Sequence, residues 1–221
     1  MLLADNPFEP ISVEALTAIY RWPEEAVRFV EGEGDGLHIV GDAGMGKTAL
    51  LLQLQRRLEA GGVEAPYTCF PVEGRIEVDT VQLGPVTLLD ETDRLSVGEL
   101  KGLLGRLRET GQRAALAGHR DQGRRIGRAR LSCMYLALGP LREPVEAAQL
   151  VDDRIALATG TRHHEFPLDT GAAAALLLCS GGNIERCLQL AYEIFEDLER
   201  PRAITADDVA AAAAALSQAL R

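Results

Sequence analysis

Short apolar runs alternate with amphipathic stretches through the first 140 residues of the chain. Five of these runs have the length and boundaries of buried strands, namely GLHIV (36–40), EAPYTCF (64–70), GPVTLLDETD (84–93), RAALAG (113–118) and SCMYLAL (132–138). Between them, leucines recur at helical spacing in 48–62 and 96–111, and Ser96 and Glu99 have the spacing of a capping box. Strands that alternate with helices predict an α/β fold with a five-stranded, mostly parallel sheet sandwiched by helices.

The pattern changes near residue 140. Four helical stretches follow with little strand signal between them, at 144–160, 169–182, 183–200 and 204–220. Asp169 or Thr170, and later Thr205, have the positions and side chains of helix N-caps. We therefore expect two domains, an α/β core over 1–140 and a small all-helical domain over 141–221.

The composition of the 221 residues, 47% hydrophobic and 25% charged, is that of a globular domain. No apolar run approaches the roughly 20 residues that span a bilayer, and the N-terminal segment lacks the basic and apolar parts of a signal peptide. We expect a cytoplasmic protein without a membrane partner. The four cysteines show no CxxC spacing, which argues against a zinc site or a disulfide framework.

The formal net charge of −10 argues against a surface that coats itself with nucleic acid. The charge is uneven, however, because between residues 106 and 130 eight arginines face only Glu109 and Asp121, a local balance of +6. These arginines are Arg106, Arg108, Arg113, Arg120, Arg124, Arg125, Arg128 and Arg130. Three interpretations stay open: a solvated helix face, an interface between subunits, and a nucleic-acid-binding face.

A glycine-rich segment, GDAGMGKT (41–48), follows the first predicted strand and opens the first long helix. Its glycines and its Lys-Thr pair fit the pattern G-x-x-x-x-G-K-[ST], in which inward-turned backbone N–H groups and a helix N-terminus bind phosphates. Lys47 is expected to bridge the β- and γ-phosphates, and Thr48 to offer its hydroxyl to Mg²⁺. The predicted nucleotide-binding residues are Gly41, Asp42, Ala43, Gly44, Met45, Gly46, Lys47, Thr48 and Ala49.

Two acids end the third predicted strand, at the edge of a parallel sheet where ligands collect. Asp90 is expected to hold the Mg²⁺ through water, and Glu91 to act as the general base that polarises the attacking water. The cofactors predicted are therefore ATP and Mg²⁺. A small-molecule kinase could use the same glycine loop, but the glutamate directly after Asp90 and the helical tail disfavour it.

GDAGMGKT and LLDETD, followed by a helical tail, resemble the AAA+ ATPases over nearly the whole chain. CSGGNIERCLQLA (179–191) is similar to the stretch that opens a lid helix in the initiator and transposition-helper branches. The resemblance implies that Arg186 is a sensor-2 arginine, reaching the γ-phosphate from the lid. It also implies a polar sensor 1, where His119 replaces the usual asparagine, threonine or serine, and an arginine finger, for which Arg128 and Arg130 are candidates.

The resemblance implies an ATPase that assembles with its own copies and acts on a DNA-associated protein partner, as transposition helpers and helicase loaders do. The alternative is an ATP-gated switch or scaffold of the STAND type without nucleic-acid binding. The acidic composition and the short segment 71–85 between the second and third strands favour that alternative. Trp22 or Tyr20 could contact the adenine ring or pack in the core.

Overall fold

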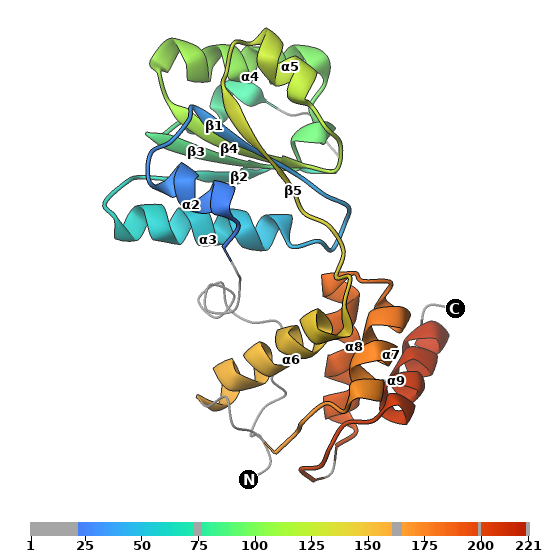
Figure 1. The fold of residues 1–221 in the computed structure, drawn as a ribbon. Helices are drawn as coiled ribbons and strands as arrows, with labels where there is room; N and C mark the ends of the chain where they lie inside the picture. Colours follow the sequence, from blue (N-terminus) through green and yellow to red (C-terminus); the bar gives the residue numbers. More distant parts are fainter. Residues whose placement is uncertain (1–21, 73–76, 161–164, 199, 220–221) are drawn as a thin grey trace. The chain divides into compact units, whose positions relative to one another are not determined.

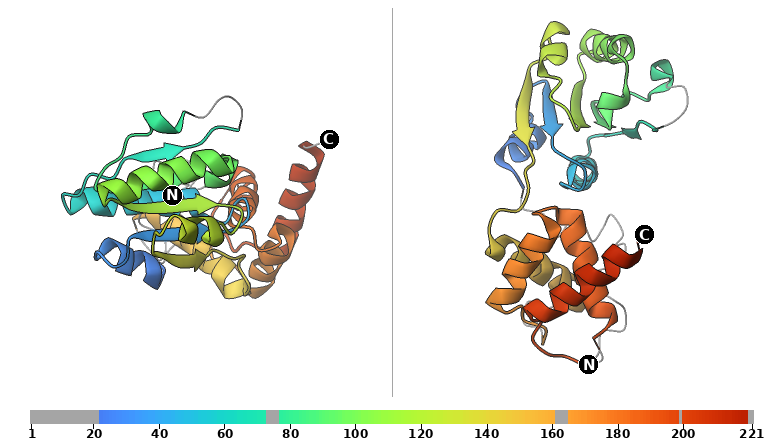
Figure 2. Two further views of the ribbon diagram at one scale, coloured as in Figure 1. Left: turned by 90° about the horizontal axis from the view of Figure 1, so that it is seen from above. Right: turned by 90° about the vertical axis from the view of Figure 1, so that its right-hand side faces the viewer.

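The structure, a computed structural model, describes residues 22–72, 77–160, 165–198 and 200–219. Contacts divide the chain into two compact units, whose described parts fall within 22–139 and 140–219. Figures 1 and 2 show an α/β unit and an all-helical unit, and each is described by itself.

A five-stranded sheet forms the centre of the first unit (Figure 1). Its strands are β1 (Gly36–Val40), β2 (Tyr67–Cys69), β3 (Val86–Asp90), β4 (Arg113–Gly118) and β5 (Cys133–Ala137). They lie in the order β2-β3-β4-β1-β5, and every neighbouring pair is parallel. The predicted α/β class and parallel sheet are therefore confirmed. The register pairs Val40 at the end of β1 with Gly118 of β4, so the carboxyl ends of these strands share one edge.

Helices cover both faces of this sheet (Figure 1). One face packs against α2 (Glu24–Val30) and α3 (Lys47–Ala60), and the other against α4 (Val97–Thr110) and α5 (Gly123–Arg128). Side chains from each helix layer form an apolar core with the sheet. The short helices α2 and α5, of seven and six residues, were not among the elements predicted from the sequence.

Helix α4 shows how local sequence sets an element. The predicted capping box is confirmed, because the Glu99 backbone N–H donates to Ser96 Oγ at 3.3 Å and the Ser96 N–H donates to Glu99 Oε2 at 2.8 Å. Gly111 ends the helix in the left-handed conformation at φ 65°. The leucines of one face are buried, whereas the glycines of the helix face open space; these glycines are Gly98, Gly102 and Gly105.

The connection between β2 and β3 contains a single 3₁₀ turn, η1 (Val78–Thr80), among its described residues. Arg106 of α4 fixes this turn by donating hydrogen bonds to the carbonyls of Val78 and Val81. The sequence had predicted that a full-length helix would not fit here, and residues 73–76 lie outside the described part of the chain.

The second unit consists of α6 (Pro144–Thr159), α7 (Thr170–Ser180), α8 (Ile184–Glu196) and α9 (Ala206–Ala219). A core cluster that includes Leu176, Cys187, Leu190 and Val209 joins these helices. The side chain of Asp169 accepts the Ala172 N–H at 2.6 Å, so it is the N-cap of α7.

The start of α9 is organised by a carboxylate instead of the expected hydroxyl cap. Asp208 accepts two hydrogen bonds from the Arg202 guanidinium, at 2.6 and 2.7 Å, and two more from the N–H and hydroxyl of Thr205, both at 2.8 Å. Thr205 stands at the predicted N-cap position, where its carbonyl accepts the Val209 N–H, but its hydroxyl donates to Asp208 instead of accepting a helix N–H. Among the residues described, no helix is both long enough and apolar enough to cross a membrane.

Candidate nucleotide-binding site

The loop between β1 and α3 requires glycine at three positions. Gly44 and Gly46 have φ values of 76° and 83°, in the left-handed region that side chains disfavour. At Gly41, an added Cβ would lie 2.6 Å from the carbonyl oxygen of Leu138, because the chain after β5 runs close beside the loop. The loop residues 41–46 thus form a tight turn that ends at the N-terminus of α3.

Lys47, the first residue of α3, lies under this loop with only 5% of its surface exposed. Its Nζ donates to the carbonyls of Gly41 at 2.7 Å and Asp42 at 2.9 Å. Burial lowers the pKa of Lys47, and the nearby carboxylates of Glu91 and Asp90 oppose that shift. A buried amine held against two backbone oxygens can exchange them for phosphate oxygens that enter the loop.

Thr48 and Asp90 meet at the carboxyl end of β3, although they lie 42 residues apart in sequence. The Thr48 hydroxyl donates to Asp90 Oδ2 at 2.7 Å, and the Asp90 side chain is almost completely buried. A hydroxyl and a carboxylate directly beside a phosphate loop are the protein ligands that suit Mg²⁺, which keeps its remaining positions for waters and phosphates. This pair fits the predicted metal site.

Tyr67 is a neighbour of Asp90 that the sequence did not indicate. Its hydroxyl, on the edge strand β2, donates to Asp90 Oδ2 at 3.0 Å. Burial and the charge of Asp90 raise the pKa of Tyr67 far above its ordinary value, so the phenol keeps its proton and acts as a donor. The sequence predicts a strand at 64–70, but only the structure shows that this strand pairs with β3, with Tyr67 beside Leu88.

Glu91 adopts a left-handed backbone conformation with φ 57°, which is uncommon for a residue other than glycine. Its Oε2 lies 3.1 Å from Nη2 of Arg94 and 3.2 Å from Nε2 of His119. Arg94 also donates to the Phe70 carbonyl at 2.5 Å, so it ties the Glu91 carboxylate to the end of β2. Arg94 had not been predicted, although it stands three residues after Glu91.

His119 follows the last residue of β4 and contacts both Lys47 and Glu91. Its Nδ1 lies 3.3 Å from Lys47 Nζ, while its Nε2 contacts Glu91. The backbone N–H of His119 donates to Asp93 Oδ1 at 2.9 Å, and a Cβ at Gly118 would lie only 2.5 Å from the same oxygen. Glycine before His119 therefore permits the contact that positions its imidazole between the loop lysine and the acid.

The remaining predicted site residues lie elsewhere. Arg128 is the last residue of α5, and Arg130 lies two residues later with a backbone φ of 59°. Both side chains are exposed. Arg186 belongs to the helical unit, on α8, where its Nε donates to the Cys179 carbonyl at 3.1 Å. Trp22 packs partly buried against the core of the α/β unit, and Tyr20 lies outside the described residues. The roles of these arginines remain predictions.

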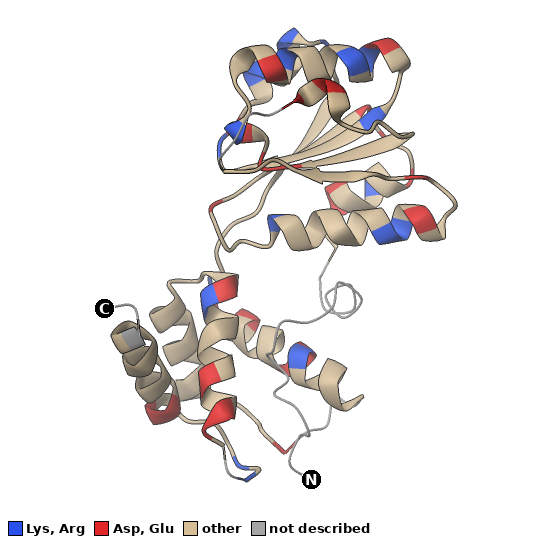
Figure 3. Cartoon of the chain, turned by 180° about the vertical axis from the view of Figure 1, so that it is seen from behind, with Lys and Arg blue, Asp and Glu red and all other residues tan. Residues whose placement is uncertain are grey.

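The arginines of segment 106–130 do not all have the same role. Arg106 holds the β2–β3 connection, and Arg113 stacks on the Phe29 ring, with its guanidinium carbon 4.4 Å from the ring centroid. These two therefore serve the fold. Figure 3 shows that other basic residues lie along the α4 and α5 layer.

The sheet order, the glycine loop and the helical unit together give the fold of AAA+ P-loop ATPases of the initiator type. Domain III of the Thermotoga maritima replication initiation protein DnaA is similar, with a TM-score of 0.64, 11% identity, and coverage of 92% of this chain and 97% of that one. The Aeropyrum pernix ORC1 protein in complex with DNA has a TM-score of 0.55 and 20% identity, with coverage of 95% of this chain and 68% of that one. AMPPCP-bound DnaA from Aquifex aeolicus has a TM-score of 0.56 and 17% identity, with coverage of 82% of this chain and 66% of that one. No protein-family model and no curated protein matches the sequence.

Proposed function

We propose that this chain is an ATPase that binds Mg²⁺ and ATP at the loop 41–48 and hydrolyses ATP to ADP and phosphate. The observation that carries the proposal is the contact of His119 with both Lys47 and Glu91, which brings a phosphate-binding group and a candidate base to one point. The fold shared with the AMPPCP-bound DnaA of Aquifex aeolicus supports nucleotide as the ligand.

Each residue has a separate task in this proposal. The backbone N–H groups of the loop and the Lys47 amine hold the phosphates, with Lys47 exchanging its carbonyl partners for phosphate oxygens. Thr48 and Asp90 hold Mg²⁺, which neutralises the charge on the phosphates when bound. Glu91 accepts the proton of the attacking water, and His119 and Arg94 orient its carboxylate.

The proposal extends to assembly and partners. We place the chain in the cytoplasm, acting on a DNA-associated protein partner, because the similar structures include a replication initiation protein and an ORC1 protein in complex with DNA. Arg128 or Arg130 would complete the site of a neighbouring copy as an arginine finger, and Arg186 would act from the helical lid as sensor 2. The proposed domains are 1–140 and 141–221.

A switch of the STAND type is the second candidate. The observation favouring it is the β2–β3 connection, in which η1 is the single helical turn among the residues described. Such a short connection offers little surface for gripping a substrate. In this candidate, ATP binding recruits a partner and slow hydrolysis ends the signal.

Lys47→Ala tests the common core of both candidates. The variant removes a charge-assisted contact worth about 1.5–3 kcal/mol, so ATP affinity should fall at least ~10-fold. Arg28→Ala, which removes an exposed cation on α2, is the control and should bind ATP as the wild type does. Titration with a fluorescent ATP analogue measures both, and unchanged affinity in Lys47→Ala would refute the proposal.

Protein concentration separates the two candidates. An ATPase that uses an arginine finger from a second copy should release more phosphate per molecule as its concentration rises, and it should lose that gain in Arg128→Ala or Arg130→Ala. A monomeric switch should show constant activity per molecule. Light scattering with and without AMPPCP would report assembly directly.

A further inference from the structure

A cavity lies in the α/β unit, between α4 and α5. Its volume is about 410 Å³, and its lining comes only from these two helices and the residue that follows α5. This size falls in the range of about 300–1,000 Å³ typical of ligand pockets. Leu100 and Leu104 contribute to its apolar part, and Val97, at the edge, is 61% exposed.

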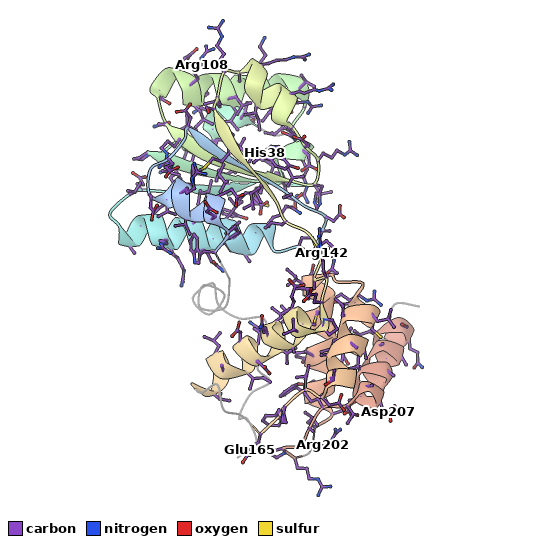
Figure 4. All side chains as sticks on the ribbon, in the orientation of Figure 1. His38, Arg108, Arg142, Glu165, Arg202 and Asp207 are labelled. Carbon is purple, nitrogen blue, oxygen red and sulfur yellow. The ribbon has the colours of Figure 1, made fainter. Side chains whose placement is uncertain are left out.

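Four cationic side chains surround this α4–α5 pocket: Lys101 and Arg108 from α4, and Arg125 and Arg128 from α5. None of the four makes a side-chain hydrogen bond or ion pair with any residue that the structure describes, and no described acidic residue lines the pocket. The site is therefore a concentration of uncompensated positive charge on a chain whose net charge is −10. Figure 4 shows Arg108 at the outer edge of this helix layer.

The glycines of α4 add a second, independent observation. Gly105 lines the pocket, and a Cβ added there, or at Gly102 one turn earlier, would meet no atom within 4 Å. A glycine inside a helix is less favourable there than alanine. No packing within the described structure accounts for that cost at these two positions. Bare backbone beside the pocket does, however, allow another chain to approach closely.

We propose that the α4–α5 pocket binds an acidic segment of a partner protein. An apolar side chain of that segment enters the pocket above Leu100 and Leu104, and its aspartates or glutamates lie next to the four cations. This site is separate from the phosphate loop of the same chain, and one of its four cations, Arg128, is also a candidate arginine finger toward a neighbouring copy.

The arrangement of charges favours a peptide over nucleic acid. Lys101 and Arg108 are seven residues apart on α4, which is about 10.5 Å along the helix axis. The other two cations of the lining, Arg125 and Arg128, belong to α5. The cations thus come from two helices and share the lining with apolar side chains, among them Leu100 and Leu104. An apolar floor contributes nothing to phosphate binding, whereas it can bury the anchor residue of a peptide.

Fluorescence anisotropy with the full chain tests the proposal. The probe is a labelled synthetic peptide of about 15 residues, with leucine and phenylalanine anchors at helical spacing and glutamate at the other positions. The comparison probe replaces every glutamate with lysine. We expect the acidic peptide to bind at least ~10-fold more tightly, with an affinity that falls as salt increases.

Two pairs of variants locate the binding. Gly105→Leu fills the pocket, and Gly127→Leu makes the same change at a glycine of α5 that also meets open space but does not line the pocket. Arg108→Glu reverses a lining charge, and Arg124→Glu reverses an exposed charge on α5 that does not line the pocket. Both lining variants should lose at least ~10-fold in affinity, while both controls bind as the wild type does.

The outcomes are separable. Absence of acidic-peptide binding, or equal losses in lining and control variants, would overturn the proposal. So would a result in which the lining variants lose binding to duplex DNA, or lose self-association, instead of binding to the peptide. Lys47→Ala should bind the peptide as the wild type does, so failure of the ATPase proposal leaves this measurement intact.

Discussion

Replacing Glu91 with glutamine tests the chemistry proposed at the end of β3. The side chain keeps its size and can keep hydrogen bonds to His119 and Arg94, but it loses the negative charge and the basicity that a general base requires. The phosphate-binding and metal-binding groups, Lys47, Thr48 and Asp90, are unchanged. We therefore expect ATP binding to persist while hydrolysis nearly stops.

The size of the effect follows from the geometry. A positioned general base contributes about 10²–10⁴-fold to rate, which corresponds to about 2.7–5.4 kcal/mol of barrier. Stability should change far less. The Glu91 and Arg94 side chains are 15% and 29% exposed, and a pair so close to solvent contributes up to about 1 kcal/mol. The left-handed backbone at Glu91 is equally unfavourable for glutamine, so it cancels in the comparison.

Phosphate release under saturating Mg²⁺ and ATP, together with equilibrium binding of the fluorescent analogue, measures the two effects separately. Glu109→Gln is the control, because Glu109 is an exposed residue on α4 outside the candidate site. Turnover by Glu91→Gln within about threefold of the wild type would show that Glu91 is not the base, since a general base contributes far more.

Three other substitutions give distinct signatures. Gly41→Ala places a methyl group 2.6 Å from a backbone oxygen and should lower both the melting temperature and ATP affinity, whereas Gly127→Ala, which meets open space, should not. Tyr67→Phe removes one hydrogen bond to Asp90 and should weaken Mg²⁺-dependent ATP binding about 3- to 10-fold in titrations at varied Mg²⁺, with Mg²⁺-free binding unchanged. Hydrogen bonds to the charged carboxylate of Asp208, first of all from Arg202, depress its pKa below the ordinary value of 3.8. These bonds therefore stabilise the fold fully at pH values above 3.8, and their contribution disappears as the pH falls through the depressed pKa. Asp208→Asn should therefore be about 1–3 kcal/mol less stable in urea at pH 7 and show a flatter decline in acid; an identical pH profile would contradict this assignment.

Local signals account for the parts of the fold that the sequence predicted best. GLHIV and RAALAG became strands at their predicted limits, because glycine and polar residues bound each apolar run. α4 begins and ends where its capping box and Gly111 indicate. The six-residue α5 escaped prediction because fewer than two turns carry too little periodicity, and its position depends on packing of Ile126 under α4.

In the candidate site, too, local motifs predicted some residues, whereas others depend on tertiary contacts. Lys47 could be placed from the glycine-loop motif, because its hydrogen bonds to Gly41 and Asp42 are local, and Asp90 could be placed from its position at the end of an apolar strand. Tyr67 and Arg94 reach the site through tertiary contacts, across the sheet and around a 3₁₀ turn, which no local pattern encodes. The arginine-rich segment shows the opposite error, since Arg106 looked like part of a surface patch and instead holds the fold.

The imidazole of His119 touches the ammonium group on one side and the carboxylate on the other. In the proposed mechanism, the group that binds phosphate and the group that activates water therefore contact the same side chain. Substitutions at Lys47 and Glu91 should be non-additive in their effect on turnover, the double variant losing less than the product of the single losses.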